Sequence, residues 1–199
     1  YLAPEGYRLF EAFNGRQALE LAKKHSVKTF ALVANMSIAA ERRDLLQQFD
    51  CVISSGNSLG YVPNDDVLLT LGQMDSLVKK GGYIYLDLRN WDMILTDKPR
   101  YYLYNPVFIE NTRVNLMQFW DYLQDGSVDF NLLYTFEQDN RIIQKEHFIE
   151  HYHPITRQII LNKLALMGYK NIETELMPAH FGSFDPSKSD WYCIIAQKA

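Results

Sequence analysis

The sequence predicts an α/β fold in which a doubly wound, mostly parallel sheet carries an inserted antiparallel sheet. In the first half of the chain, short continuous apolar runs alternate with helical patterns, as strands and helices do in βαβ units. From about Asp97 onward the runs become long, aromatic and alternating, which is typical of antiparallel strands. Two strand-like runs end the chain, and we expect them to pair antiparallel at one edge of the main sheet.

The first half of the chain contains predicted strands that are each followed by polar residues. We expect these strands at Tyr7–Glu11, Lys28–Val33, Asp50–Ser54 and Tyr83–Leu88. We expect helices between them, at Gln17–His25, Ile38–Gln48 and Asp65–Lys80. The last helix begins with acids and ends with lysines, which suits its dipole, and Gly81-Gly82 should stop it.

The second half of the chain predicts the inserted sheet and the closing elements. Turn residues separate four runs, at Tyr101–Ile109, Arg113–Gln124, Val128–Glu137 and Arg141–His151. A last helix and two last strands follow, at Ile155–Met167, Asn171–Leu176 and Trp191–Gln197. We therefore expect a single domain over residues 1–199, with residues 98–152 as an inserted antiparallel sheet.

Composition excludes some classes of partner. The formal net charge is −4 and the pI is about 5.7, without the basic stripe typical of nucleic-acid binders. No apolar run approaches the roughly 20 residues of a membrane span. Cys51 and Cys193 lie in strand-like runs and are expected to be free thiols, which favours a cytoplasmic location. The sequence leaves a homo-oligomer open.

Polar residues follow each predicted strand of the main sheet, where open α/β sheets bind ligands. Glu11 ends the first strand, Asn35-Met36 follows the second, Ser55–Asn57 follows the third and Arg89 follows the fourth. A carboxylate can accept both hydroxyls of a ribose, an amide can pair with an adenine edge, and methionine can pack on the adenine face. Gly56 allows close approach of the backbone, and Arg89 can hold a carboxylate through two hydrogen bonds.

Each of these residues also has a plainer interpretation. Glu11 can be a solvated strand end, Asn35 a turn residue and Asn90 a helix N-cap. His147, His151 and His153 suggest a metal, but no cysteine or acid pattern completes a site, so we expect none. We expect a solvated loop just before the last strand, at Asp185, Lys188 and Asp190.

The same segments resemble the glycine and glycine/sarcosine N-methyltransferases. Phe49–Val62 reads FDCVISSGNSLGYV and is similar to their FDAVICLGNS motif. Leu86–Leu95 is similar to their DxRNYDxIL segment, and Ala34-Asn35-Met36 to their A-N/D-W step. The order and spacing of the three motifs agree, and the resemblance runs from about Gly6 to the end of the chain. It implies a Rossmann-like class I methyltransferase sheet that uses S-adenosylmethionine.

The resemblance implies roles on the cofactor side. Glu11 would hold the ribose, and Asn35 would meet the adenine edge. Met36 would replace the usual tryptophan as the wall on which the adenine stacks. The backbone around Ser55 and Gly56 would meet the methionyl part of the cofactor.

The resemblance also implies roles on the substrate side. Asn57 and Arg89 would hold the carboxylate of an amino acid such as glycine or sarcosine. Tyr102 and Tyr152 match tyrosines that line the family's substrate pocket and would orient the amine. We name no catalytic base, because an amine can lose its proton on entering a poorly solvated pocket.

The family's D-x-x-x-G-x-G cofactor loop does not occur in the sequence. We expect that the chain given starts after this loop; an eroded, inactive relative is the alternative. Three functions stay open: an amino-acid N-methyltransferase, a methyltransferase for another small metabolite such as an aminosugar, and a non-catalytic cofactor-binding relative. A nicotinamide-dependent dehydrogenase is disfavoured by the long antiparallel insertion and the final pair of strands.

Overall fold

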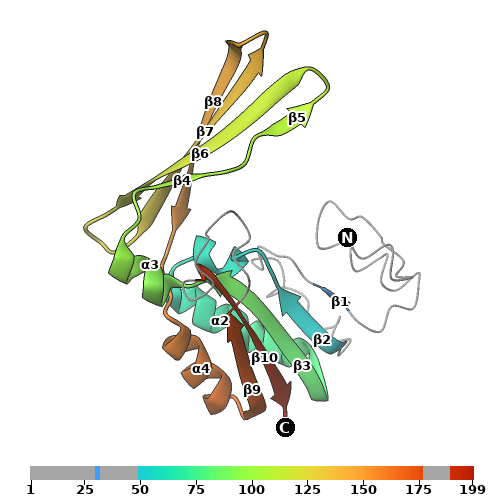
Figure 1. Ribbon diagram of the computed structural model, residues 1–199. Helices are drawn as coiled ribbons and strands as arrows, with labels where there is room; N and C mark the ends of the chain where they lie inside the picture. Colours follow the sequence, from blue (N-terminus) through green and yellow to red (C-terminus); the bar gives the residue numbers. More distant parts are fainter. Residues whose placement is uncertain (1–29, 32–48, 177–188) are drawn as a thin grey trace.

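The computed structural model describes residues 30–31, 49–176 and 189–199, which form two sheets and the helices around them (Figure 1). The first sheet has the order β1-β2-β3-β10-β9. Its strands are β1 (Phe30–Ala31), β2 (Phe49–Ser54), β3 (Val78–Arg89), β9 (Tyr169–Leu176) and β10 (Trp191–Lys198). The helical elements are η4 (Ser58–Tyr61), α2 (Asn64–Leu77), α3 (Trp91–Asp97) and α4 (Arg157–Leu166).

The first sheet is mixed in direction. β1, β2 and β3 are mutually parallel, whereas β10 runs antiparallel to both β3 and β9. The predicted antiparallel pair at the end of the chain is therefore confirmed. The edge position, however, belongs to β9, because β10 pairs with β3 from Trp191↔Arg89 to Gln197↔Tyr83 and so lies inside the sheet. This pairing places the start of β10 beside the carboxyl end of β3.

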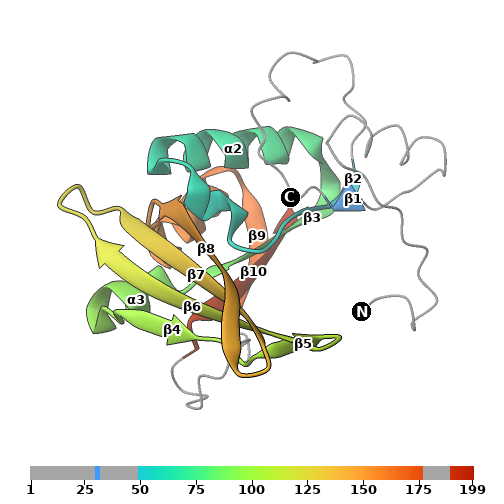
Figure 2. The ribbon, with the colours of Figure 1, turned by 90° about the horizontal axis from the view of Figure 1, so that it is seen from above.

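The helices α2 and α4 share one hydrophobic core with the first sheet. Figure 2 shows α2 running alongside this sheet. The members of this core from α2, α4 and the central strands are all buried: Val67, Leu71, Met74, Ile160, Leu164, Val52, Ile84, Leu86 and Ile194. Each fully buried aliphatic side chain stabilises the fold by roughly 1.5–3 kcal/mol. This core fixes the sheet and leaves the ends of β2 and β3 free to carry polar residues.

The end of α2 differs from the prediction. The helix was expected to reach Lys80, but it ends at Leu77, and β3 begins at Val78. Val78 is buried and pairs with Phe49 of β2, so burial of a β-branched side chain in the sheet prevails over the helical pattern. A Cβ on Gly82 would lie 2.9 Å from the Asp50 carbonyl oxygen, so this glycine permits close strand approach and does not stop the helix.

The second sheet has the order β4-β6-β7-β8, with β5 paired to β6, and is antiparallel throughout. Its strands are β4 (Tyr101–Leu103), β5 (Val107–Ile109), β6 (Thr112–Tyr122), β7 (Val128–Gln138) and β8 (Arg141–Tyr152). The expected antiparallel strands are present, and the first one splits in two around Tyr104–Pro106. Positive φ angles at Asp139 and Asn140 give the turn between β7 and β8 the backbone that a tight hairpin requires.

A second core cluster joins this sheet to α3. Trp91 and Ile94 of α3 are buried together with Trp120, Phe130 and Tyr152 of the second sheet. The Trp120 and Phe130 rings are stacked, with 4.2 Å between centroids and 5° between planes. The second sheet therefore stands beyond the carboxyl ends of β2 and β3, as Figure 1 shows.

Several predicted elements lie outside the described residues. These are the strand at Tyr7–Glu11 and the helices at Gln17–His25 and Ile38–Gln48. β1 falls within the strand predicted at Lys28–Val33. Among the helices that are described, none has the length and apolar character needed to cross a membrane.

Replacement of Leu71 by alanine tests the first core. Leu71 is fully buried in α2 and Leu69, two residues away on the same helix, is 65% exposed. We expect Leu71→Ala to lower the free energy of unfolding by about 2–5 kcal/mol through lost burial and an unfilled cavity. Leu69→Ala, the matched control, should change it by less than about 1 kcal/mol. Urea unfolding measures both, and equal effects would contradict this assignment of the core.

Candidate functional site

A cavity of about 430 Å³ lies where the two sheets meet. Its walls come from the turn after β2, the end of β3, the start of β10 and the second sheet. The lining residues are Gly56, Asn57, Asp87, Arg89, Tyr104, Gln118, Tyr152 and Trp191. Four of the predicted site residues are therefore brought together: Gly56, Asn57, Arg89 and Tyr152.

The turn after β2 is held by Asp87 of β3. The Gly56 N–H donates to Asp87 Oδ1 at 2.6 Å, and the Asn57 N–H donates to the Asp87 carbonyl at 3.3 Å. Gly56 has φ +70°, a conformation that glycine adopts with little strain. A Cβ at this position would meet no heavy atom within 4 Å, so the cavity is open next to the Gly56 backbone. Ser55 precedes this turn and accepts a hydrogen bond from the Ser58 hydroxyl through its carbonyl oxygen.

Asn57 connects the turn to the end of β3. The residue is 1% exposed, and its Oδ1 accepts a hydrogen bond of 3.1 Å from the Arg89 backbone N–H. Its φ of +58° is a left-handed conformation, which asparagine tolerates better than most residues. A Cβ on Gly60 would lie 2.7 Å from Asn57 Nδ2, so the glycine makes room for this side chain. Nδ2 has no hydrogen-bond partner within the described part of the chain.

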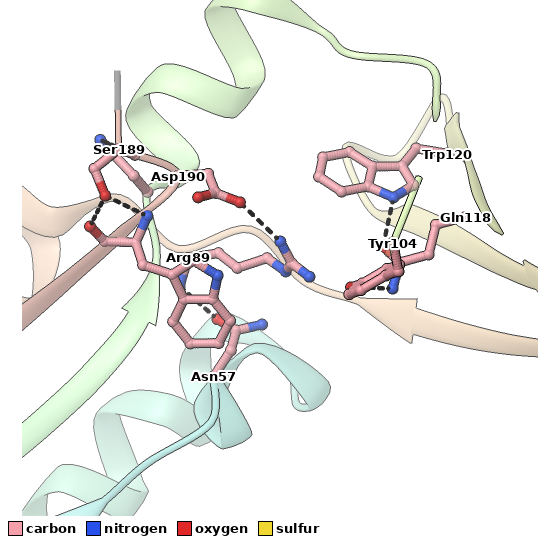
Figure 3. A network of polar contacts seen from close by, with 9 residues as sticks. Asn57, Arg89, Tyr104, Gln118, Trp120, Ser189 and Asp190 are labelled. Carbon is pink, nitrogen blue, oxygen red and sulfur yellow. Dashed lines mark hydrogen bonds and ion pairs between the residues drawn. The ribbon is translucent and has the colours of Figure 1, made fainter. Parts of the chain in front are cut away.

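Arg89 extends from β3 between Asp190 and Asn57 toward Tyr104 (Figure 3). Its Nη1 lies 3.5 Å from Asp190 Oδ2, and only 8% of the Arg89 side chain and 10% of the Asp190 side chain are exposed. The guanidinium carbon lies 5.1–5.3 Å from the centroids of three aromatic rings, those of Trp120, Phe130 and Trp191. Arg89 thus has a buried anionic partner and an aromatic enclosure.

The prediction for Asp190 was wrong. A solvated loop was expected there, but Asp190 is buried against Arg89 because β10 inserts beside β3. Its carbonyl oxygen accepts a hydrogen bond of 2.7 Å from the Asn90 N–H, which pins the loop to the end of β3. The pairing partner of the last strand decides this position, and the local sequence carries no signal for it. Asp185 and Lys188 lie outside the described residues.

The second sheet contributes a hydrogen-bonded chain that sequence reasoning missed. Trp120 Nε1 donates to Gln118 Oε1 at 3.0 Å, and Gln118 Nε2 donates to the Tyr104 hydroxyl at 2.9 Å. Burial raises the pKa of Tyr104, and the positive charge of Arg89 lowers it in part. Gln118 and Trp120 lie two residues apart on the same face of β6. A glutamine within an otherwise apolar face was the signal in the sequence that could have indicated this hydrogen-bonded chain.

Tyr152 lines the cavity and belongs to a cluster with Tyr61 and Glu150. Its hydroxyl lies 2.7 Å from Glu150 Oε2 and 2.6 Å from the Tyr61 hydroxyl, which itself donates to Glu150 Oε2 at 2.9 Å. Burial, followed by the hydrogen bonds to Tyr61 and Glu150, raises the pKa of Tyr152 far above its ordinary value. The hydroxyl therefore stays protonated and can accept a hydrogen bond without acting as a base.

The remaining predicted residues lie elsewhere. Tyr102 does not line the cavity. It packs behind the cavity wall, with its ring centroid 5.1 Å from that of Tyr104 and 6.5 Å from that of Trp120. The predicted cofactor contacts Glu11, Asn35 and Met36 lie outside the described residues.

The histidines of the second sheet have ordinary polar partners. His151 Nδ1 lies 2.6 Å from Asp129 Oδ1, and His147 Nε2 lies 3.1 Å from Asn131 Oδ1. The rings of His151 and His153 are in edge-to-face contact, 4.7 Å apart. No group of three or more histidine, cysteine or acidic residues in residues 49–176 and 189–199 could hold a metal ion.

Comparison with known proteins gives relatives of one class. No family model matches the chain. A glycine/sarcosine/dimethylglycine N-methyltransferase of Actinopolyspora halophila is 25% identical over 79% of this chain and 26% of its own length. A glycine/sarcosine N-methyltransferase of Aphanothece halophytica is 27% identical over 78% of this chain and 54% of its own length. The chain thus spans about a quarter and about half of these two relatives.

The structural comparison decides the fold. An S-adenosylmethionine-dependent methyltransferase from Clostridium acetobutylicum ATCC 824 superimposes with a TM-score of 0.56, covering 92% of this chain and 70% of its own, at 12% identity. The fold is that of a class I S-adenosylmethionine-dependent methyltransferase. The resemblance to this class of enzymes is confirmed. In the described part of this methyltransferase fold, two of the four strand pairings are antiparallel, so a mostly parallel sheet stays a prediction.

The pKa of Tyr102 leads to a prediction about alkaline stability. Burial raises this pKa to about 12, whereas a tyrosine in an unfolded chain ionises near pH 10. The neutral hydroxyl is favoured in the folded state, so its contribution is complete below about pH 10 and is lost as the pH rises toward about 12. We expect Tyr102→Phe to lose less unfolding free energy between pH 9 and 11 than the wild type. Tyr101→Phe, which removes an exposed hydroxyl from the same strand, should behave like the wild type in urea unfolding.

Proposed function

We propose that this chain carries the catalytic fold of an S-adenosylmethionine-dependent methyltransferase that transfers a methyl group to a small-molecule amine. The observation that carries the proposal is the cavity at the carboxyl ends of β2 and β3, lined from both sheets. Its floor is a glycine turn that brings backbone to the cavity surface, and its walls combine aromatic rings with polar side chains. The methyltransferase fold and the relatives at 25% and 27% identity support the same assignment.

The cofactor is proposed to lie against the turn after β2. Gly56 fits this role because its positive φ exposes backbone and the space beyond it is open. Asp87 holds the turn in place through two hydrogen bonds, so the turn does not have to reorganise when a ligand binds. Ser55 would contribute backbone contacts beside Gly56, and Glu11, Asn35 and Met36 would meet the ribose and the adenine. When bound, the cofactor supplies the methyl group on its sulfonium.

The acceptor is proposed to enter from the side of the second sheet. Tyr152 can accept an N–H from the amine, because its own proton is shared with Glu150 and Tyr61. The aromatic rings of Trp191 and Tyr104 line the cavity and would shield a bound acceptor from water. A poorly solvated pocket favours the neutral amine, so the protein has to orient the nitrogen and does not need a strong base.

The identity of the acceptor is open among the small-molecule amines. An amino acid such as glycine or sarcosine is the first candidate, because the motifs and the names of both curated relatives point to it. In that case Asn57 and Arg89 would hold the carboxylate and Tyr102 would support the pocket from behind. An aminosugar or another small metabolite is the second candidate, and a cofactor-binding relative without activity is the third.

Organisation and location belong to the same proposal. We propose that residues 98–152 are an insertion into one domain spanning residues 1–199. A cytoplasmic location is proposed because Cys51 and Cys193 are free thiols.

Binding of S-adenosylhomocysteine tests the function directly. The full-length protein should show a rise in Tm that grows with the ligand concentration, as expected when a ligand binds the folded state only. A methyl-transfer screen over small amines should then give turnover. Stabilisation without turnover of any amine would favour the non-catalytic relative, and absence of stabilisation would exclude the proposed function.

Replacement of Gly56 tests the cofactor position. Gly56→Ala adds a methyl group at the open wall of the cavity and is expected to weaken S-adenosylhomocysteine binding by about tenfold or more. The positive φ of Gly56 should also make this variant less stable by about 1–2 kcal/mol. Gly126→Ala is the matched control, because Gly126 has φ +89° with no atom near a Cβ and lies in the turn between β6 and β7. It should cost similar stability and leave ligand affinity, measured by calorimetry, unchanged. Equal affinities for both variants would contradict the placement.

A further inference from the structure

The positive charge in the cavity is already matched by a carboxylate of this chain. Arg89 Nη1 and Asp190 Oδ2 lie 3.5 Å apart, and about nine-tenths of each side chain is buried. Asp190 cannot easily turn away into water, because its carbonyl is bonded to the Asn90 N–H and the preceding Ser189 hydroxyl is bonded to the Trp191 carbonyl. Arg89 therefore lines the cavity with a buried partner behind it, since Asp190 itself does not line the cavity.

The rest of the guanidinium is also occupied by protein groups. Arg89 lies near enough to Tyr104 for its positive charge to lower the pKa of the Tyr104 hydroxyl in part. The rings of Trp120, Phe130 and Trp191 enclose the guanidinium, as their centroid distances of 5.3, 5.1 and 5.2 Å show. A second carboxylate on this arginine would lie beside Asp190, and the two like charges would repel. Displacement of Asp190 would leave a buried carboxylate without its partner, which is strongly unfavourable.

The cavity lining presents hydrogen-bond acceptors to a ligand, whereas its arginine, Arg89, is already paired with Asp190. The Tyr152 hydroxyl shares its proton with Glu150 and Tyr61, which leaves a lone pair for the cavity. Asp87 adds a further carboxylate to the lining. These groups match a ligand that is rich in N–H and O–H donors.

We propose that the methyl acceptor is a small amine that bears hydroxyl groups in place of a carboxylate, such as an amino alcohol or an aminosugar, and that Asp190 determines this choice. Asp190 neutralises Arg89 and so disfavours binding of the carboxylate of an amino acid. This inference rests on the proposed function and, among its candidate acceptors, selects the hydroxyl-bearing amines over the amino acids.

A screen with matched acceptor pairs tests the substrate class. The full-length protein, with S-adenosylmethionine as methyl donor, is assayed with ethanolamine against glycine, with N-methylethanolamine against sarcosine, and with glucosamine. We expect at least one of the three hydroxyl-bearing amines to have a kcat/KM that exceeds those of glycine and sarcosine by about tenfold or more. A preference for glycine or sarcosine would overturn the inference while supporting the proposed function.

Asp190→Asn tests the residue. The amide keeps the size of the side chain but leaves Arg89 with an unmatched charge, so the ratio of kcat/KM for glycine to that for ethanolamine should rise by about tenfold or more. Asp121→Asn is the matched control: it removes the same charge from the exposed pair that Asp121 of β6 forms with Arg100, and it should leave the ratio unchanged. A ratio that is the same in Asp190→Asn and the wild type would overturn the role of Asp190.

Acetate gives a measurement that does not depend on turnover. Acetate at tens of millimolar should raise the Tm of Asp190→Asn and not that of the wild type, with sodium chloride at equal ionic strength as the reference. Stabilisation of the wild type, or of neither protein, would overturn the inference. S-adenosylhomocysteine should stabilise the wild type and Asp190→Asn alike, and its failure to stabilise the wild type would count against the proposed function instead.

Discussion

The buried contact between Arg89 and Asp190 is the interaction on which the site depends. Arg89 ends β3, Asp190 directly precedes β10, and the rings around the guanidinium belong to the second sheet and to β10. Asn57 adds the turn after β2 through its hydrogen bond to the Arg89 N–H. One arginine therefore joins every part of the structure that lines the cavity. Breaking a buried pair of this kind is costly because it leaves an unmatched charge. The pair therefore keeps β3, β10, the turn after β2 and the second sheet in fixed relative positions.

The two hydrophobic clusters explain why the cavity lies where it does. The first cluster fills the space between the helices α2 and α4 and the sheet, whereas the second joins α3 to the aromatic face of the inserted strands. Polar side chains occur in the gap between them, and each is tied to backbone or to another side chain. The cavity is rigid where it is lined by Asp87 and Asn57, which favours preorganised binding of a ligand.

Much of the fold was predictable because its signals are local. The inserted strands alternate polar and apolar residues, and β6, β7 and β8 lie close to their predicted ranges. The polar turn after β2 and Arg89 after β3 follow from reading what comes after each buried strand. The end of α2 was not predictable from the helical pattern, because Val78 and Gly82 serve pairing with β2, which is a contact between segments.

The sequence by itself determined the fold class, the resemblance to S-adenosylmethionine-dependent methyltransferases and the cavity residues Gly56, Asn57, Arg89 and Tyr152, since hydrophobic period and motif order are written in the chain. Only the tertiary structure decided what surrounds Arg89. Asp190 reads as a loop residue until β10 is seen beside β3, and Gln118 and Tyr104 read as strand residues until the second sheet is placed over the cavity. The net charge that a ligand meets in the cavity depends on residues that are distant in sequence, such as Arg89 and Asp190. It is therefore set only when the protein folds and brings them together.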